Sequence, residues 1–299
     1  MTDSHEHHVY VTFWGTRGSI STPGVRTQKY GGNTPCVSVR YQDTQVILDA
    51  GTGLRELGVQ FQQQNPGPGH RDIHLFLSHT HWDHIQGLPF FVPAYVKGNR
   101  ITVYGSPKKE RVLESILYGQ MDANYFPVQM KALAAEFSVV ELNDQCLHIG
   151  PLAIYWQEQM FHPGGSVRYR IEAGGKIIVY ATDVEVDAFL GGPPCGDPYT
   201  QALAEAYCEF IRDADLLIAD GQYTAEEYPA KVGWGHTSIP LLVQVAHAER
   251  VKQLAVFHHD PQHSDQMLDA LWPACLAPTA TLMPSMNSFW AREALTVLI

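Results

Sequence analysis

The chain has 299 residues, of which 45% are hydrophobic and 17% are charged, a composition typical of a folded soluble protein with a substantial core. Its formal net charge of −11 argues against a bulk electrostatic grip on long nucleic acid, but leaves room for a local basic pocket. No apolar run approaches the length of a membrane span, so we expect no membrane partner.

The cysteines and the N-terminus indicate a cytoplasmic protein. The five cysteines are odd in number, widely spaced and form no C-x-x-C pair, which favours reduced thiols over a single disulfide. The N-terminus is polar and lacks the apolar stretch of a signal peptide. We interpret residues 1–8, including His5, His7 and His8, as a flexible, solvated tail that binds no metal.

Short strand-forming runs recur along the whole chain. They cover 9–14, 36–41, 45–48, 73–77, 100–104, 137–140, 152–156, 167–171, 177–181, 216–219, 253–257 and 281–283. Helical patterns cover 54–64, 107–117, 199–212 and 239–250, with Val112 and Ile116 on one face of the second. Without a short-period repeat or a low-complexity linker, the pattern predicts one α/β domain over residues 1–299.

Two residues near the first strands have two interpretations each. Residues 15–24 form a glycine-rich loop whose free N–H groups could approach an anion, and Arg17 is its one fixed charge. Arg17 could form a salt bridge that pins the loop or bind a substrate phosphate. Asp49 ends a strand and could cap the following helix or orient a metal-bound histidine.

The most informative stretch is Ser-His-Thr-His-Trp-Asp-His, residues 78–84, which directly follows the apolar run 73–77. Because side chains alternate along an extended chain, His79 and His81 could hold one ion together. Asp83 and His84 follow after a turn and could face a second ion. Imidazole with carboxylate suits zinc, manganese or iron(II).

Further candidate ligands follow strands in the second half of the chain. His162 lies between two predicted strands, Asp183 follows the strand 177–181, and His258 and His259 follow the strand 253–257. Each is weak evidence alone, but together with residues 79–84 they supply side chains for two adjacent metal ions.

This set resembles the metallo-β-lactamase superfamily, whose hallmark is H-x-H-x-D-H followed by a later His, Asp and His. The resemblance implies a four-layer αββα sandwich with two divalent ions, zinc first and manganese or iron as alternatives. It implies that His79, His81 and His162 hold one ion, that Asp83, His84 and His258 hold the other, and that Asp183 bridges them. His258 is preferred because it follows the strand directly, and His259 remains the alternative.

Two further segments are similar to the phosphodiesterase branch of that superfamily. They are Phe-Trp-Gly-Thr-Arg-Gly-Ser at residues 13–19 and Gly-Trp-Gly-His-Thr-Ser at residues 233–238. The resemblance implies that His236 acts near the leaving oxygen and that Asp220 orients it. The order His-Thr-Ser departs from the commoner His-Ser-Thr.

The resemblance leads to a functional hypothesis, the hydrolysis of a small phosphodiester such as a cyclic nucleotide. A metal-bridging hydroxide, steered by Asp83, would attack phosphorus and His236 would serve as general acid. Residues 85–161 contain no projecting basic arm of the kind that the tRNA endonucleases of this branch carry, which disfavours tRNA. A lactonase or other acyl hydrolase is the main alternative, and a homodimer is common in the family.

Overall fold

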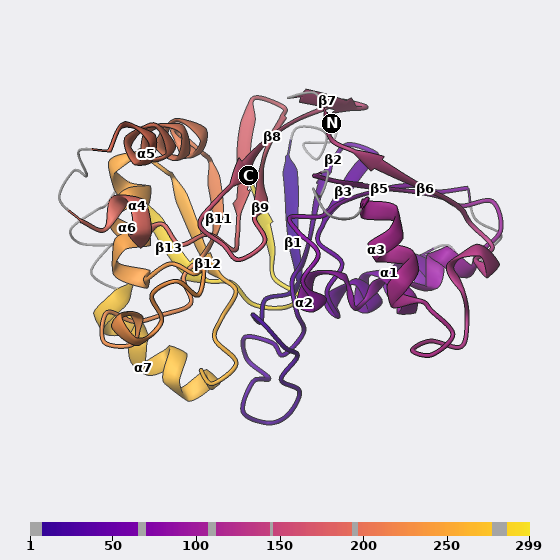
Figure 1. Cartoon of the computed structure of the whole chain (residues 1–299), viewed down its shortest axis with the longest axis horizontal. Coiled ribbons are helices and arrows are strands. Elements are labelled where there is room, and N and C mark those ends of the chain that lie inside the picture. The colour runs from indigo at the N-terminus through magenta and orange to yellow at the C-terminus, as the bar shows by residue number, and fades with distance from the viewer. Residues whose placement is uncertain (1–7, 65–69, 107–111, 144–145, 193–196, 277–285) are drawn as a thin grey trace, which may run out of the picture.

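Two seven-stranded sheets form the centre of the computed structural model, which describes residues 8–64, 70–106, 112–143, 146–192, 197–276 and 286–299 (Figure 1). The first sheet has the order β14-β1-β2-β3-β4-β5-β6. Its strands are β1 (Val9–Gly15), β2 (Cys36–Tyr41), β3 (Thr44–Leu48), β4 (Asp72–Phe76), β5 (Arg100–Gly105), β6 (Glu136–Glu141) and β14 (Thr296–Leu298).

The second sheet has the order β13-β12-β11-β10-β9-β8-β7. Its strands are β7 (Cys146–Ile149), β8 (Leu152–Gln159), β9 (Ser166–Ala173), β10 (Lys176–Ala181), β11 (Leu216–Asp220), β12 (Gln253–Phe257) and β13 (Asn287–Trp290). β10, β11, β12 and β13 run parallel to one another, so their carboxyl ends meet at one edge. Every residue of β11 is buried, as expected of a central parallel strand covered on both faces.

Helices cover the outer faces of both sheets (Figure 1). They are α1 (Gly53–Gln64) and α3 (Leu113–Gln120) on the first sheet's side, and α4 (Asp187–Leu190), α5 (Pro198–Ile211), α6 (Ile239–Ala248) and α7 (Asp265–Cys275) on the second's. The short α2 (Trp82–Ile85) follows β4 and lies near the centre, close to β1. Short 3₁₀ turns cover Leu88–Phe90, Val92–Tyr95, Met130–Ala132 and Tyr228–Ala230. The predicted order of helix, sheet, sheet and helix is therefore observed.

Three apolar clusters separate these four layers. Phe13 and Phe76 of the first sheet pack with Tyr180 and Phe257 of the second in the cluster between the sheets. A second cluster joins α5 and α6 to the outer face of the second sheet, and a third joins α1 and α3 to the outer face of the first. Removing this apolar surface from water is the main force that holds the layers together.

The structure corrects one helix and adds elements that the sequence patterns did not predict. In α3 the buried residues are Leu113 and Leu117, and Ile116 packs against them as predicted, whereas Val112 precedes the helix and is exposed, so the prediction was wrong for Val112. β7, β13, β14 and α7 were not predicted. The predicted strand at 281–283, the start of the helix at 107–111 and residues 1–7 of the tail lie outside the described residues.

Two broader expectations can be compared with the described residues. Cys36, Cys146, Cys208 and Cys275 are free thiols. In the described part of the chain, no helix has the length and apolar character that a membrane span needs.

Candidate active site

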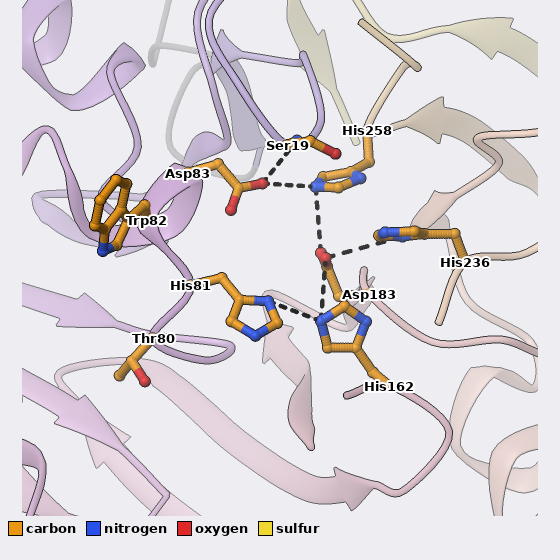
Figure 2. Close-up of a pocket in the computed structure, with 9 residues that line it drawn as sticks. All are labelled: Ser19, Thr80, His81, Trp82, Asp83, His162, Asp183, His236 and His258. Atoms are coloured by element: carbon orange, nitrogen blue, oxygen red, sulfur yellow. Dashed lines mark hydrogen bonds and ion pairs between the residues drawn. The ribbon is translucent and has the colours of Figure 1, made fainter. Parts of the chain in front are cut away.

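Polar side chains from both sheets meet in a cavity of about 450 Å³. Its lining comprises Ser19, Thr80, His81, Trp82, Asp83, His162, Asp183, His236 and His258 (Figure 2). These residues follow β1, β4, β8, β10 and β12 or belong to the loop before α6. The packing of one sheet on the other therefore brings together ligands that lie far apart in the sequence.

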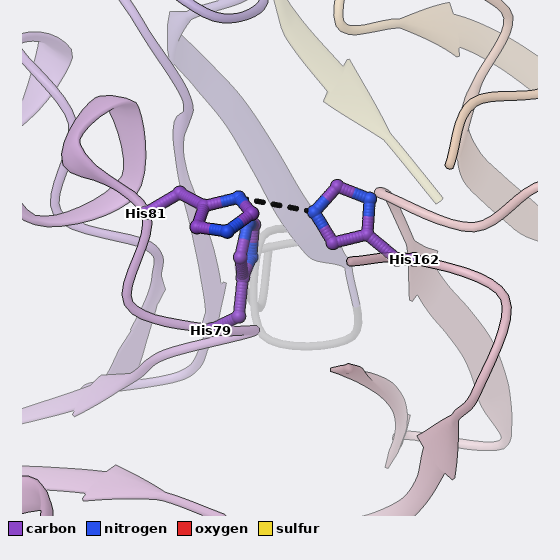
Figure 3. Close-up of side chains that lie close together, drawn as sticks. All are labelled: His79, His81 and His162. Carbon is purple, nitrogen blue, oxygen red and sulfur yellow. Dashed lines mark hydrogen bonds between the residues drawn. The ribbon is translucent and has the colours of Figure 1, made fainter. Parts of the chain in front are cut away.

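Three histidines form one side of this site (Figure 3). His162 Nε2 lies 3.1 Å from His81 Nδ1, and the ring of His79 lies 4.4 Å and 4.8 Å from the rings of His81 and His162. His79 Nε2 is buried and has no hydrogen-bond partner among the described residues. Burial lowers the pKa of all three imidazoles, which favours the neutral form that binds a metal.

Asp83, His84 and His258 form the other side. His84 Nε2 lies 3.3 Å from His258 Nε2, and Asp83 Oδ2 lies 3.3 Å from each of those two nitrogens. Two ligand atoms on one tetrahedral zinc ion, each about 2.0–2.1 Å from it, lie roughly 3.3–3.4 Å apart. The spacing therefore fits a shared ion.

Asp183 lies between the two groups of ligands. Its Oδ1 is 3.8 Å from both His79 Nε2 and His162 Nε2, whereas its Oδ2 is 3.3 Å from His84 Nε2 and 3.5 Å from His258 Nε2. Each carboxylate oxygen thus faces a different group, as a bridging ligand would. Burial acts to raise the pKa of Asp183, but His258, His84 and His79 hold it well below the ordinary value.

The pKa of His84 bears on how a metal ion would compete with a proton at this site. Burial acts to lower the pKa of His84, but Asp183, Asp83 and Asp49 raise it well above the ordinary value. A cation between these carboxylates would satisfy the same negative charge that holds the proton. Metal binding would therefore displace the proton from His84.

Asp49 fixes the orientation of His84. The Nδ1–H of His84 donates to Asp49 Oδ2 at 2.7 Å, and Tyr180 OH donates to the same oxygen at 2.7 Å. Ser78 donates its backbone N–H to Oδ1 at 2.7 Å and its hydroxyl to Oδ2 at 2.8 Å. These contacts support the orienting role predicted for Asp49 over the helix cap.

His236 and Asp220 are adjacent, as the sequence predicts. Asp220 is the last residue of β11, and its Oδ2 lies 2.6 Å from His236 Nδ1. His236 lines the cavity and stacks on His258 with 5.1 Å between ring centroids. Burial lowers the pKa of His236 and raises that of Asp220 well above its ordinary value, so both groups favour their uncharged forms before substrate binds.

His259 points away from this site. Its Nε2–H donates to the carbonyl of Ala291 at 2.8 Å, and its ring packs edge-on against Trp290. Of the two adjacent histidines, only His258 lines the cavity. The geometry therefore favours the preferred assignment.

Arg17 pins the glycine-rich loop, as one of its two predicted roles requires, but through carbonyl groups in place of the predicted salt bridge. Its guanidinium is fully buried and donates to the carbonyls of Gly31, Asp260 and His263. Every hydrogen bond found for it within the described ranges goes to a carbonyl oxygen, and it does not line the cavity. It connects the glycine-rich loop to the segment after β12, and the neighbouring Ser19 N–H donates to Asp83 Oδ2 at 2.8 Å.

Sequence reasoning missed Glu185, which organises the loop before His236. Its carboxylate accepts from Tyr228 OH at 2.7 Å and from the N–H groups of Gly233 and Gly235 at 2.9 and 3.0 Å. The Gly235 carbonyl in turn accepts from His162 Nδ1 at 3.0 Å. A Cβ at Gly235, where φ is +86°, would lie 2.4 Å from His162 Nδ1, which explains the glycine. No local sequence signal marks Glu185.

Comparisons with known proteins agree with this architecture. A family model described as "Beta-lactamase superfamily domain" matches residues 44–259. The ribonuclease Z of Thermoplasma acidophilum is 24% identical over 286 residues, which cover 86% of this chain and 88% of that protein.

Three solved structures resemble the fold of this chain, although each shares no more than 18% of its sequence with it. Unliganded yeast PDE1 has a TM-score of 0.69 and 16% identity, covering 97% of this chain and 99% of its own. A diphosphatase from the PhnP family has a TM-score of 0.65 and 16% identity, covering 97% of both chains. Zn²⁺-bound PqqB from Methylobacterium extorquens has a TM-score of 0.59 and 18% identity, covering 96% and 99%. These likenesses confirm the predicted αββα fold.

Proposed function

This chain belongs to the β-lactamase superfamily, whose domain spans residues 44–259, and on that premise we propose that it is a metal-dependent phosphodiesterase for a small phosphodiester. One observation carries the proposal. The carboxylate of Asp183 lies between two groups of metal-ligating side chains, next to a buried His236–Asp220 pair.

The donor set fits two divalent ions, with zinc as the first choice and manganese or iron as alternatives. His79, His81 and His162 would hold one ion, Asp83, His84 and His258 the other, and Asp183 both. The buried, unpartnered His79 Nε2 supports this, and the zinc in PqqB favours that metal. Bound there, the ions would supply an activated water and positive charge for the phosphate oxygens.

His236 is the proposed general acid. A bound phosphodiester brings negative charge to the cavity and so favours the protonated imidazole. Asp220 holds Nδ1, which fixes the ring while a proton is delivered to the leaving alkoxide. Asp83, whose Oδ2 is fixed by the Ser19 N–H, would orient the attacking water.

A small substrate such as a cyclic nucleotide is proposed although relatives are named ribonuclease Z. The net charge of −11 supports this choice, because long nucleic acid is held mainly through Lys and Arg. The tRNA endonucleases of this branch carry a basic arm that the sequence did not predict between His84 and His162. The described residues of that stretch form β5 to β8 and α3, which are elements of the two sheets and their helical layer, and this supports a substrate smaller than tRNA. We also propose that the protein is cytoplasmic, which the four free thiols support. A homodimer is proposed because homodimers are common in the family.

The His236→Ala variant tests this proposal. Loss of a general acid should lower kcat for bis(p-nitrophenyl) phosphate by ~10²–10⁴-fold, with metal content by mass spectrometry unchanged. His247→Ala is the control, because His247 lies in the last turn of α6 and does not line the cavity. An unchanged rate in His236→Ala, or loss of metal, would remove His236 from this role.

A further inference from the structure

The rim of the cavity carries one exposed aromatic ring, that of Trp82. Trp82 is the first residue of α2 and lies between His81 and Asp83 in the chain (Figure 2). It is 81% exposed although it lines the cavity. Among the described residues, no other aromatic ring or cation packs against its indole.

An exposed indole forgoes the stability that a tryptophan side chain gains when its large apolar surface is buried. Trp82 lies directly between two proposed metal ligands, His81 and Asp83, so its backbone position is fixed next to the metal site. The rest of the cavity lining is polar: one serine, one threonine, four histidines and two aspartates. Trp82 is therefore the only large apolar face beside the reacting centre within the described lining.

Phosphate groups and metal ions do not stack on an indole, whereas a planar aromatic ring of the substrate would. Aromatic side chains stack on nucleobases through their π-faces without needing a particular base. The cavity volume of about 450 Å³ lies within the range of sites for small organic ligands.

We propose that Trp82 is a specificity-determining residue that stacks on a planar aromatic group, such as a nucleobase, carried by the phosphodiester. This rests on the proposed phosphodiesterase function and narrows its substrate class to esters that present such a ring. The indole would bind the ring at the rim while the phosphate lies among the histidines and aspartates.

Two esters with the same leaving group isolate this contact. Thymidine 5′-(p-nitrophenyl) phosphate and methyl p-nitrophenyl phosphate both release p-nitrophenol and differ only in the remaining alcohol. The quantity to measure is the ratio of their kcat/KM values in zinc-loaded wild type, Trp82→Ala and Trp82→Phe. Tyr199→Ala is the control, because Tyr199 is an exposed aromatic residue on α5 outside the cavity.

Wild type should favour the thymidine ester, and Trp82→Ala should lower that preference by roughly 5- to 150-fold. Trp82→Phe should retain most of the preference, and Tyr199→Ala all of it. Thymidine monophosphate should quench tryptophan fluorescence in wild type and much less in Trp82→Phe.

Three outcomes would distinguish failure of the stacking role of Trp82 from failure of the proposed phosphodiesterase activity. The same ratio in Trp82→Ala as in wild type would overturn the stacking role. An unchanged ratio with a shift from dimer to monomer on a sizing column would assign Trp82 to an interface between copies, which also overturns it. If wild type hydrolyses neither ester, the phosphodiesterase proposal itself fails.

Discussion

Four non-glycine residues at the site, one of them Ser19 with a φ of 62°, adopt left-handed backbone conformations. Asp49, Asp183 and His258 have φ values of 61°, 56° and 59°, and each comes one or two residues after the end of β3, β10 or β12. Positive φ is uncommon for non-glycine residues, although Asp and His adopt it more often than most, and such conformations are often found at functional sites. It turns the chain sharply as it leaves each strand.

The turn at His258 leads to a test of the last ligand. His258→Ala should lose about one of the two proposed ions per chain, because His258 Nε2 lies 3.3 Å from the nitrogen of His84 and from the carboxylate of Asp83. His259→Ala should keep both ions, since its ring binds a carbonyl away from the cavity. Mass spectrometry of dialysed protein measures this. Full loading of His258→Ala with a deficit in His259→Ala would reverse the assignment.

Glu185 supports the site without lining the cavity. Glu185→Ala should weaken zinc affinity or kcat by roughly 10- to 100-fold, because three donors on the loop that orients His162 and His236 lose their acceptor. Glu185→Gln keeps one acceptor oxygen and should recover part of the loss. Chelator competition and steady-state kinetics measure the two effects.

The control for Glu185 is Glu205→Ala, an exposed position on α5 that should change neither quantity. A different outcome would contradict the orienting role of Glu185. If Glu185→Ala loses its fold and Glu185→Gln shows no better zinc affinity or kcat than Glu185→Ala, Glu185 has only a general structural role.

At the scale of elements, Arg17 connects the glycine-rich loop after β1 to the segment after β12. Arg17→Met should lower the free energy of unfolding by about 3 kcal/mol, because buried carbonyls lose a charged donor. Arg55→Met, on an exposed position of α1, should change it by less than about 0.5 kcal/mol. Urea unfolding measures both, and equal effects would exclude the proposed connection.

The strands that carry the site could be predicted, whereas several peripheral elements could not. β11 is buried at every position, and β4, β10 and β12 end in buried apolar residues. Each of the four strands has a histidine or aspartate at its last residue or within three residues of it, so pattern and chemistry agree. β14 has three residues and owes its strand conformation to pairing with β1. α7 contains Pro273, a residue that argues against a helix, yet Ser264 caps its start and Leu268 is buried.

Contacts between distant loops were equally invisible to sequence patterns. Glu185 meets Gly233 and Gly235 only because the fold brings their loops together. The sequence left Arg17 with two possible roles, a salt bridge that pins the loop or a contact to a substrate phosphate, but in the fold its guanidinium donates to three carbonyls. The resemblance to the family motif predicted the proposed ligands, and Asp49 and Asp220 were also predicted as orienting groups, whereas Glu185 could be found only from the fold.

For the whole molecule, acid should destabilise the fold partly through His259. Burial, followed by the charge of Arg17, lowers the pKa of His259 to about 3. Between that value and the ordinary pKa of about 6.5, the unfolded chain binds a proton that the folded chain does not. The stability is therefore present above pH 6.5 and is lost as the pH falls toward 3.

Urea unfolding of metal-free protein at pH 7 and pH 5 tests this, with His259→Gln as the comparison. The loss of stability between the two pH values should be smaller in the variant, because glutamine takes up no proton. An equal loss in both proteins would assign the acid sensitivity to other groups.

We propose that this superfamily member hydrolyses phosphodiesters and not acyl esters. The most direct measurement compares turnover of bis(p-nitrophenyl) phosphate and a simple lactone by zinc- and manganese-loaded protein. We expect turnover of the phosphodiester without turnover of the lactone. Lactone turnover alone would contradict the account and leave His236 and Asp220 as a structural pair.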